Sequence, residues 1–125
     1  MSFGKEADEV MSKKMFNRCR EVGINCFDTA INYSGGRSEE ILGKCIADCR
    51  DEVIITSKVG YPSGENINSR GLFRRNIMLS TDTSLKRLNT DRIDIYFVHK
   101  FDPLTDFEET LQAFNDLQKK EKFFI

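Results

Sequence analysis

Residues 23–44 read GINCFDTAINYSGGRSEEILGK and contain, in order, an apolar run, an acid, a turn and the beginning of a helix. The run over residues 24–29 is typical of a short strand and leads into Asp28. Two adjacent glycines after Tyr33 are typical of a turn. Ser38 followed by two glutamates predicts a helix with Ser38 as its N-cap. The stretch therefore predicts a strand–loop–helix unit that holds an acid and a phenol close together.

The rest of the chain repeats this pattern. Apolar residues at steps of three and four predict helices over residues 10–22, 38–49, 74–88 and 105–117. Short apolar runs predict strands over residues 24–29, 53–57 and 93–98, with residues 123–125 as the start of another strand. A capping box from Thr105 to Glu108 begins the last helix, and residues 60–71 form a long polar loop.

Each predicted helix has an apolar stripe that we expect to be buried. These stripes are Val10, Met11, Met15, Phe16, Cys19 and Val22; Ile41, Leu42, Cys45, Ile46 and Cys49; Ile77, Met78, Thr81, Leu85 and Leu88; and Phe107, Leu111, Phe114 and Leu117.

Alternating helices and strands favour right-handed parallel β-α-β units, which occur in open α/β sheets and in (β/α) barrels. No G-x-G-x-x-G motif follows a predicted strand, so a dinucleotide-binding open sheet has little support. A barrel places its chemistry at the carboxyl ends of its strands.

Composition limits the range of functions. The chain has 125 residues, which predicts one domain over residues 1–125, and a net charge of −1 with a pI of about 5.9. This charge balance predicts no nucleic-acid partner. The apolar runs are too short to cross a membrane, and the N-terminus lacks the apolar stretch of a secretory signal. We therefore predict a cytoplasmic protein.

Four cysteines, at positions 19, 26, 45 and 49, fit that location. We expect reduced thiols that fill a core facing the helices, because free cysteine behaves as a small apolar residue. The spacing does not resemble a metal site, and the one histidine, His99, is distant in sequence, so no metal is predicted.

Groups capable of proton chemistry follow the three complete predicted strands. These groups are Asp28, Lys58 and His99, and Tyr33 lies in the loop after the first of them. Each alone has a common structural explanation: a turn former, a solvated amine, a structural imidazole and a packing phenol. Together, at the carboxyl ends of parallel strands, they predict one site.

The combination makes chemical sense for proton transfer to a carbonyl oxygen. A free phenol has a pKa of about 10 and holds its proton at neutral pH, but a nearby ammonium favours the phenolate. Tyr33 would then act as general acid, with Lys58 beside it and Asp28 holding Lys58 charged and oriented. His99 would donate a hydrogen bond to the same carbonyl oxygen.

With these residues, the sequence resembles the N-terminal half of an aldo-keto reductase. GINCFDTAINYSGGRSEEILGK is similar to the family pattern G-x-N-x-F-D-T-A-x-x-Y-G-x-G-x-S-E-x-x-L-G. VIITSKVGY resembles the strand with the family's lysine, and SLKRLNTDRIDIYFVHKFDP resembles the stretch with its histidine. The similarity covers residues 2–125 and is nearest to the aryl-alcohol dehydrogenase-like and potassium-channel β-subunit branch.

The resemblance implies a (β/α)₈ TIM-barrel lineage and the tetrad Tyr33, Asp28, Lys58 and His99 as catalytic residues. It implies reversible reduction of small aldehydes or ketones to alcohols with NADPH, and Asp28 also belongs to the cofactor site. Most other cofactor contacts of the family lie in its later loops, beyond this chain's last residue.

Length is the departure from the family, since a (β/α)₈ barrel takes about 250 residues. We expect about half a barrel of parallel strands, with Cys26, Ile55, Tyr96 and Val98 facing inward without an opposite wall. Open strand edges then favour self-association or pairing with another chain. The isolated chain is expected to be weakly active or inactive. The alternatives are a non-catalytic regulatory subunit resembling channel β subunits, and a degenerate gene fragment.

Overall fold

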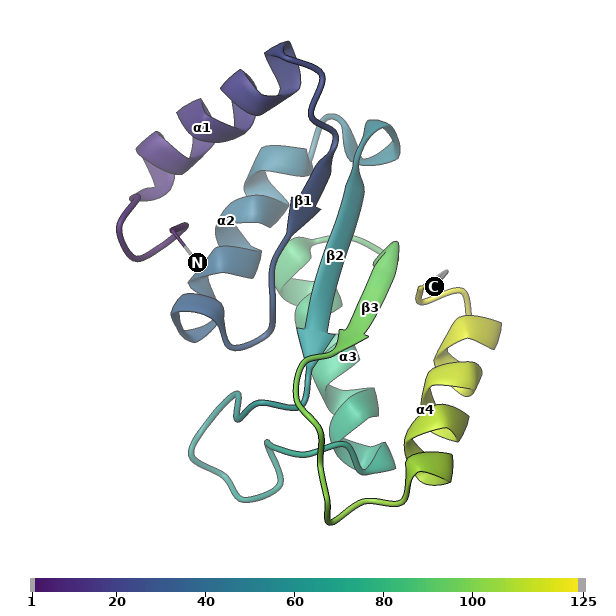
Figure 1. Cartoon of the computed structure of the whole chain (residues 1–125). Coiled ribbons are helices and arrows are strands. Elements are labelled where there is room, and N and C mark those ends of the chain that lie inside the picture. Colours follow the sequence, from purple (N-terminus) through teal and green to yellow (C-terminus); the bar gives the residue numbers. More distant parts are fainter. Residues whose placement is uncertain (1, 124–125) are drawn as a thin grey trace.

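The computed structural model describes residues 2–123, in which four α-helices alternate with three strands (Figure 1). The helices are α1 (Glu9–Glu21), α2 (Arg37–Ile46), α3 (Arg74–Leu88) and α4 (Phe107–Lys119). The strands are β1 (Cys26–Asp28), β2 (Ile54–Val59) and β3 (Ile95–Val98), and two short 3₁₀ helices are η1 (Tyr33–Gly36) and η2 (Arg50–Glu52). Every helix and complete strand predicted from the sequence is present, with ends that differ by a few residues.

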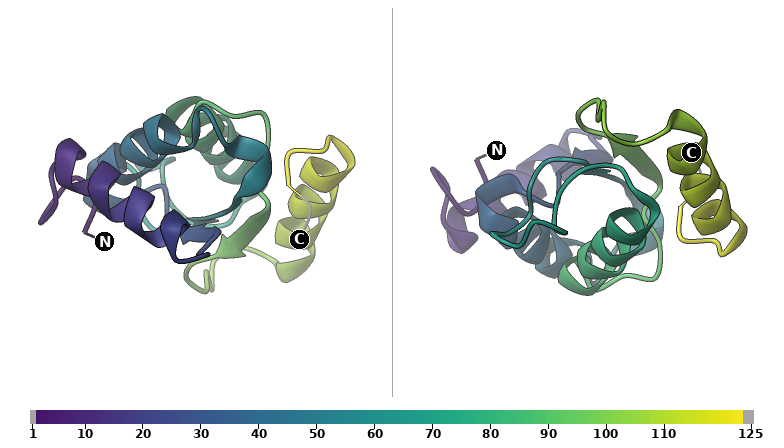
Figure 2. Two further views of the ribbon diagram at one scale, coloured as in Figure 1. Left: turned by 90° about the horizontal axis from the view of Figure 1, so that it is seen from above. Right: turned by 90° about the horizontal axis from the view of Figure 1, so that it is seen from below.

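The strands form one sheet in the order β1-β2-β3, and both pairs are parallel. In the register, Asp28 lies opposite Thr56, and Lys58 lies opposite Phe97. The helices lie around the outside of the curved sheet (Figure 2). This arrangement confirms the prediction of an α/β fold with parallel strands and is consistent with part of a (β/α)₈ barrel.

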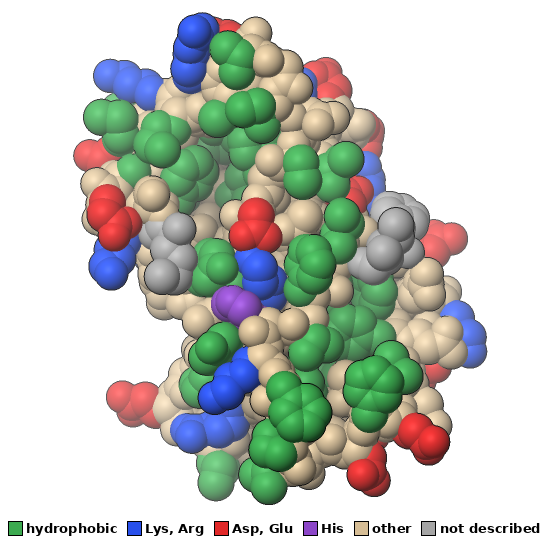
Figure 3. Space-filling model, in the orientation of Figure 1, with side chains coloured by type: hydrophobic (Ala, Val, Ile, Leu, Met, Phe, Trp, Pro, Cys, Tyr) green, Lys and Arg blue, Asp and Glu red, His purple; other side chains and the backbone are tan. Residues whose placement is uncertain are grey.

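The core lies between the sheet and the helices, and here one prediction is wrong. Ile55 and Tyr96 point toward the helices, where both are buried, and not toward the inside of a barrel. Cys26, two residues before Asp28 on β1, is exposed on the open face as predicted, whereas Val98 shares the helix-facing side of β3 with Tyr96 but is exposed. Side chains alternate along a strand, so Lys58 on the open face requires Ile55, three residues earlier, to lie on the helix face. Hydrophobic side chains on the open face surround acidic, basic and histidine side chains (Figure 3).

The predicted burial of two helix stripes is wrong in part. Phe16 of α1 and Leu117 of α4 are buried as expected, but several stripe neighbours are exposed: Val10, Met11, Met15, Val22, Phe107 and Leu111. The buried residues of these outer helices form a narrow line, Ser12 and Phe16 in α1 and Thr110, Ala113 and Leu117 in α4. An apolar stripe in the sequence therefore overstates the width of the buried face.

Both predicted helix caps are also wrong. Gly36, with a φ of 97°, is the N-cap of α2, and Ser38 lies inside the helix with its hydroxyl 2.9 Å from the hydroxyl of Thr29. Asp106 precedes α4, and the hydroxyl of Thr105 donates to Asp102 at 2.7 Å. In both places the side chain bonds another loop segment instead of the first turn of its helix.

The four cysteines are free thiols, and the prediction that they fill the core is confirmed only in part, because Cys45 and Cys49 pack against the core without being fully buried. Cys26 is exposed and the other three are half-buried. Phe123 forms a parallel bridge with Ile93, and residues 124–125 of the predicted last strand lie outside the described residues. Among the helices of residues 2–123, none has the length and apolar character needed to cross a membrane.

Close packing of α2 on α3 gives the first prediction. A Cβ added at Gly43 of α2 would lie 2.7 Å from the backbone oxygens of Arg87 and Leu88. We expect Gly43→Ala to lower the free energy of unfolding by about 1–3 kcal/mol, measured by urea denaturation followed by circular dichroism. Gly64→Ala is the control, because its nearest side-chain atoms lie 3.9 Å away. Equal urea midpoints for the two variants would contradict the close helix contact.

Candidate active site

The parallel register places an acid and an amine side by side at one end of the sheet. Asp28 is the last residue of β1, and Lys58 lies near the end of β2. The ammonium of Lys58 donates to Oδ2 of Asp28 at 2.6 Å. The Lys58 side chain is 14% exposed and the Asp28 side chain is 54% exposed. The amine is therefore held beneath a carboxylate that reaches solvent.

Lys58 has two further acceptors, both from the loop after β1. Its ammonium donates to the backbone oxygen of Thr29 at 2.7 Å and to the hydroxyl oxygen of Tyr33 at 3.2 Å. Its Nζ lies 4.6 Å from the centre of the Tyr33 ring. A lysine ammonium has three hydrogen-bond donors, so Asp28, Thr29 and Tyr33 satisfy all of them.

Tyr33 begins η1, a tight turn with unusual backbone geometry. Ser34, Gly35 and Gly36 all have positive φ values, of 51°, 64° and 97°. Of these three residues, Ser34 has the least favourable backbone conformation, because its Cβ makes a positive φ energetically unfavourable. The Ser34 hydroxyl donates to the backbone oxygen of Phe3 at 2.9 Å, which helps to hold the turn.

Arg87 of α3 holds the same loop from the helix side. Its Nη1 donates to the backbone oxygen of Ile31 at 2.8 Å and to Glu39 at 3.3 Å. A Cβ on Gly36 would lie 2.4 Å from the guanidinium carbon, so only glycine allows this approach. Tyr33 therefore lies in a loop that is fixed at several points.

His99 follows β3 and completes the group. Its backbone N–H donates to the oxygen of Val59 at 2.8 Å, which extends the sheet by one residue. Its ring packs nearly perpendicular to the rings of Tyr33 and Tyr61, whose centroids lie 5.6 Å and 4.7 Å away. Within the described residues its Nδ1 is buried without a hydrogen-bond partner.

The surroundings also change the acidity of His99. Loss of solvent lowers the pKa of the imidazole from its ordinary value of 6.5, and the charge of Lys58 lowers it further, while Asp28 acts in the opposite direction. The neutral form is therefore favoured at neutral pH. A neutral imidazole carries one N–H donor and one acceptor nitrogen.

A comparison with protein families agrees with this geometry. The sequence profile described as "Aldo/keto reductase family" matches residues 1–122. The chain belongs to the aldo/keto reductase family.

Three curated relatives illustrate the range of this aldo/keto reductase family. A "Probable voltage-gated potassium channel subunit beta" of Arabidopsis thaliana is 37% identical over 118 residues, covering 92% of this chain and 36% of the relative. "Aldo-keto reductase YhdN" of Bacillus subtilis is 40% identical over 112 residues, 88% of this chain and 34% of the relative. "Norsolorinic acid reductase" of Aspergillus flavus is 35% identical over 132 residues, covering 94% of this chain and 34% of the relative. The chain thus spans about a third of the length of the curated relatives it matches.

All four tetrad positions of this aldo/keto reductase chain lie together at the carboxyl ends of the strands. Lys58 contacts Asp28 and Tyr33 directly, and His99 contacts the Tyr33 ring. Their catalytic roles stay predictions. In the described part of the chain, no group of three or more His, Cys, Asp and Glu side chains is placed to hold a metal ion.

Two residues in direct contact with tetrad side chains were not predicted from the sequence. The Thr56 hydroxyl donates to Oδ1 of Asp28 at 2.5 Å, and Tyr61 packs its ring edge against His99. Thr56 is two residues before Lys58 on the same strand, so the alternation of side chains places both on one face and was a usable signal. Tyr61 lies in a loop, and no sequence pattern predicted its position.

The altered pKa of His99 gives the second prediction. Because His99 is the one histidine, its imidazole titration can be followed by NMR without overlap. We expect a folded-state pKa below 6.5, and a higher value in Lys58→Met, since the lysine charge opposes protonation. Lys86→Met, at an exposed lysine of α3, is the control and should leave the titration unchanged.

The same shift affects stability in a defined direction. Between the folded-state pKa and the ordinary value of 6.5, the unfolded chain binds more protons than the folded chain. The free energy of unfolding should therefore gain a contribution as pH rises through this window. A His99 titration at or above 6.5, unaffected by Lys58→Met, would contradict the proposed contact between the two residues.

Proposed function

We propose that the tetrad serves the reversible reduction of small aldehydes or ketones to alcohols with NADPH. The observation that carries this proposal is the Lys58 ammonium, which donates to both Asp28 and the hydroxyl oxygen of Tyr33. Membership of the aldo/keto reductase family supports the same reaction class. Because the chain spans about a third of its relatives, the proposal concerns the tetrad and is tested on the 125-residue chain itself.

The geometry suits a proton transfer by Tyr33. When its hydroxyl protonates a carbonyl oxygen, the phenolate that remains lies 3.2 Å from the Lys58 ammonium, whose charge stabilises it. Asp28 balances the ammonium and, with the backbone oxygen of Thr29, fixes its direction. Tyr33 then acts as general acid in reduction and as general base in the reverse reaction.

His99 is placed to orient the substrate. Its ring contacts Tyr33 and the residue is half-buried, so part of the imidazole beside the phenol is open to a substrate. One neutral N–H donor beside the Tyr33 hydroxyl would give the oxygen two hydrogen bonds from different directions. This arrangement fixes the angle at which the carbonyl carbon faces its reductant.

The residues present fit the reactive end of a nicotinamide cofactor, which when bound supplies the hydride. Asp28 is the residue we assign to it, because its half-exposed carboxylate accepts two protein hydrogen bonds and has capacity for a ribose hydroxyl. The four free cysteines support a reducing compartment, and we place the protein in the cytoplasm on that basis.

The third prediction tests the reaction directly. The purified chain should oxidise NADPH in the presence of 4-nitrobenzaldehyde, and Tyr33→Phe should lower the rate by at least about 100-fold, because the acid is lost. Tyr61→Phe is the matched control, since it also removes a phenol hydroxyl and keeps the ring contact with His99. NADPH consumption no greater than in a blank would refute reductase activity of the isolated chain, and an equal rate in both variants would refute the acid role of Tyr33.

A second function is supported by the relatives named as potassium-channel β subunits in Arabidopsis thaliana and in Oryza sativa, each covering 92% of this chain. In that case the chain would bind a channel and its turnover would be incidental. Co-elution with the cytoplasmic domain of a voltage-gated potassium channel, together with negligible NADPH oxidation, would favour this regulatory role. Separate elution with NADPH turnover would favour the reductase.

A further inference from the structure

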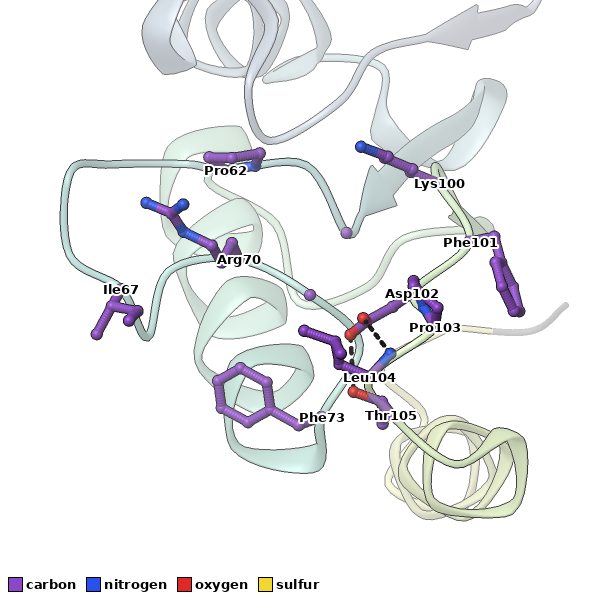
Figure 4. A pocket seen from close by; sticks show the side chains of 12 residues that line it. Pro62, Ile67, Arg70, Phe73, Lys100, Phe101, Asp102, Pro103, Leu104 and Thr105 are labelled. Carbon is purple, nitrogen blue, oxygen red and sulfur yellow. Dashed lines mark hydrogen bonds between the residues drawn. The ribbon is translucent and has the colours of Figure 1, made fainter.

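A cavity of about 470 Å³ lies between two loops near the tetrad, but no tetrad residue lines it (Figure 4). One loop, residues 60–73, follows β2, and the other, residues 100–105, follows β3. We call this cavity the loop pocket. Its volume is within the range of about 300–1,000 Å³ that is usual for small-molecule sites.

Asp102 holds the two loops in one arrangement. Its carboxylate accepts hydrogen bonds from the backbone of Leu72 at 2.8 Å, the backbone of Leu104 at 3.0 Å and the hydroxyl of Thr105 at 2.7 Å. Gly71 also donates to the backbone oxygen of Gly60 at 3.1 Å. The one carboxylate of the pocket is therefore committed to the loop backbone, and the pocket has a defined shape.

Two cations that line the loop pocket have no carboxylate partner among residues 2–123. Seven of the nine arginines in the chain form an ion pair within the described residues, and Arg70 is one of the two that do not. Lys100 contacts the Tyr61 ring, 5.4 Å from its centre, and forms no ion pair in this part of the chain. In Figure 4 both charged groups extend toward the Pro62 side. The chain as a whole has 19 basic and 20 acidic residues, so an overall excess of positive charge does not account for two unpaired cations at one pocket.

The remaining wall is apolar and open to solvent. Ile67, Phe101 and Leu104 are 76%, 75% and 93% exposed, and Phe73 lies beside Leu104 in Figure 4. Exposed large apolar side chains gathered around a cavity are unusual for a surface loop and are typical of binding sites. The loop pocket thus combines an apolar wall with a cationic end.

We propose that the loop pocket binds a small organic anion, namely a carboxylate attached to an aromatic body. The ring would lie against Phe73 and Leu104, and the carboxylate would accept hydrogen bonds from the guanidinium of Arg70, whose planar fork matches two oxygens. Lys100 contributes a second positive charge at the same end. Because both cations face solvent, binding weakens as salt concentration rises.

The probe that tests this proposal is 2-naphthoate, titrated into the full 125-residue chain without NADPH and followed by backbone amide NMR. We expect saturable shifts at residues 62–73 and 100–105, and weaker binding of the neutral analogue 2-naphthylmethanol. Arg70→Gln and Lys100→Gln should each weaken 2-naphthoate binding about fivefold, the effect of an exposed ionic contact of about 1 kcal/mol. Tyr33→Phe should bind as the unmodified chain does, which separates this site from the proposed reaction.

Arg75→Gln is the matched control, because Arg75 also lacks an ion pair within residues 2–123 but does not line the pocket. It should bind 2-naphthoate as the unmodified chain does. Equal affinity for the acid and the alcohol, equal weakening by Arg75→Gln, or shifts spread over the open face of the sheet would each overturn the proposal.

Discussion

Glu39, a carboxylate with no exposed surface at the start of α2, is the contact on which the site's position depends. It accepts hydrogen bonds from the hydroxyl of Ser57 on β2 at 2.8 Å and from Arg87 on α3 at 3.3 Å. A buried charge without partners costs several kcal/mol. The two helices and the central strand therefore have to keep the arrangement that satisfies Glu39, and Lys58 is the next residue of that strand.

The same arginine transmits this constraint to the reactive loop. Arg87 also holds the backbone oxygen of Ile31, and its guanidinium covers Gly36, so both ends of the segment around Tyr33 are fixed by α3. A proton donor needs a defined position relative to its partners. In this fold a loop residue gains that position from a helix packed on the opposite side of the sheet from the open face.

The sequence predicted the order of helices and strands, because the apolar periods of the two differ. It also predicted that Asp28, Tyr33, Lys58 and His99 lie together, because polar groups at parallel strand ends share one edge, while their catalytic roles stay predictions. It did not predict that Ile55 faces the helices, since alternation shows two faces without saying which is covered. The sequence also did not predict the role of Arg87, because that role depends on a contact between distant parts of the chain. Its partner Ile31 is 56 residues away, and no local pattern contains such a contact.

The proposed chemistry of the site depends on direct contact between the amine of Lys58 and the phenol of Tyr33, whose ring centre lies 4.6 Å from Nζ. The most direct test is a nuclear Overhauser effect between the ε-methylene protons of Lys58 and the ring protons of Tyr33 in the isotope-labelled chain. We expect a clear signal that weakens in Asp28→Ala, which removes one of the three acceptors that orient the amine. Absence of this signal in an unmodified chain whose amide spectrum shows the folded sheet would contradict the contact between Lys58 and Tyr33.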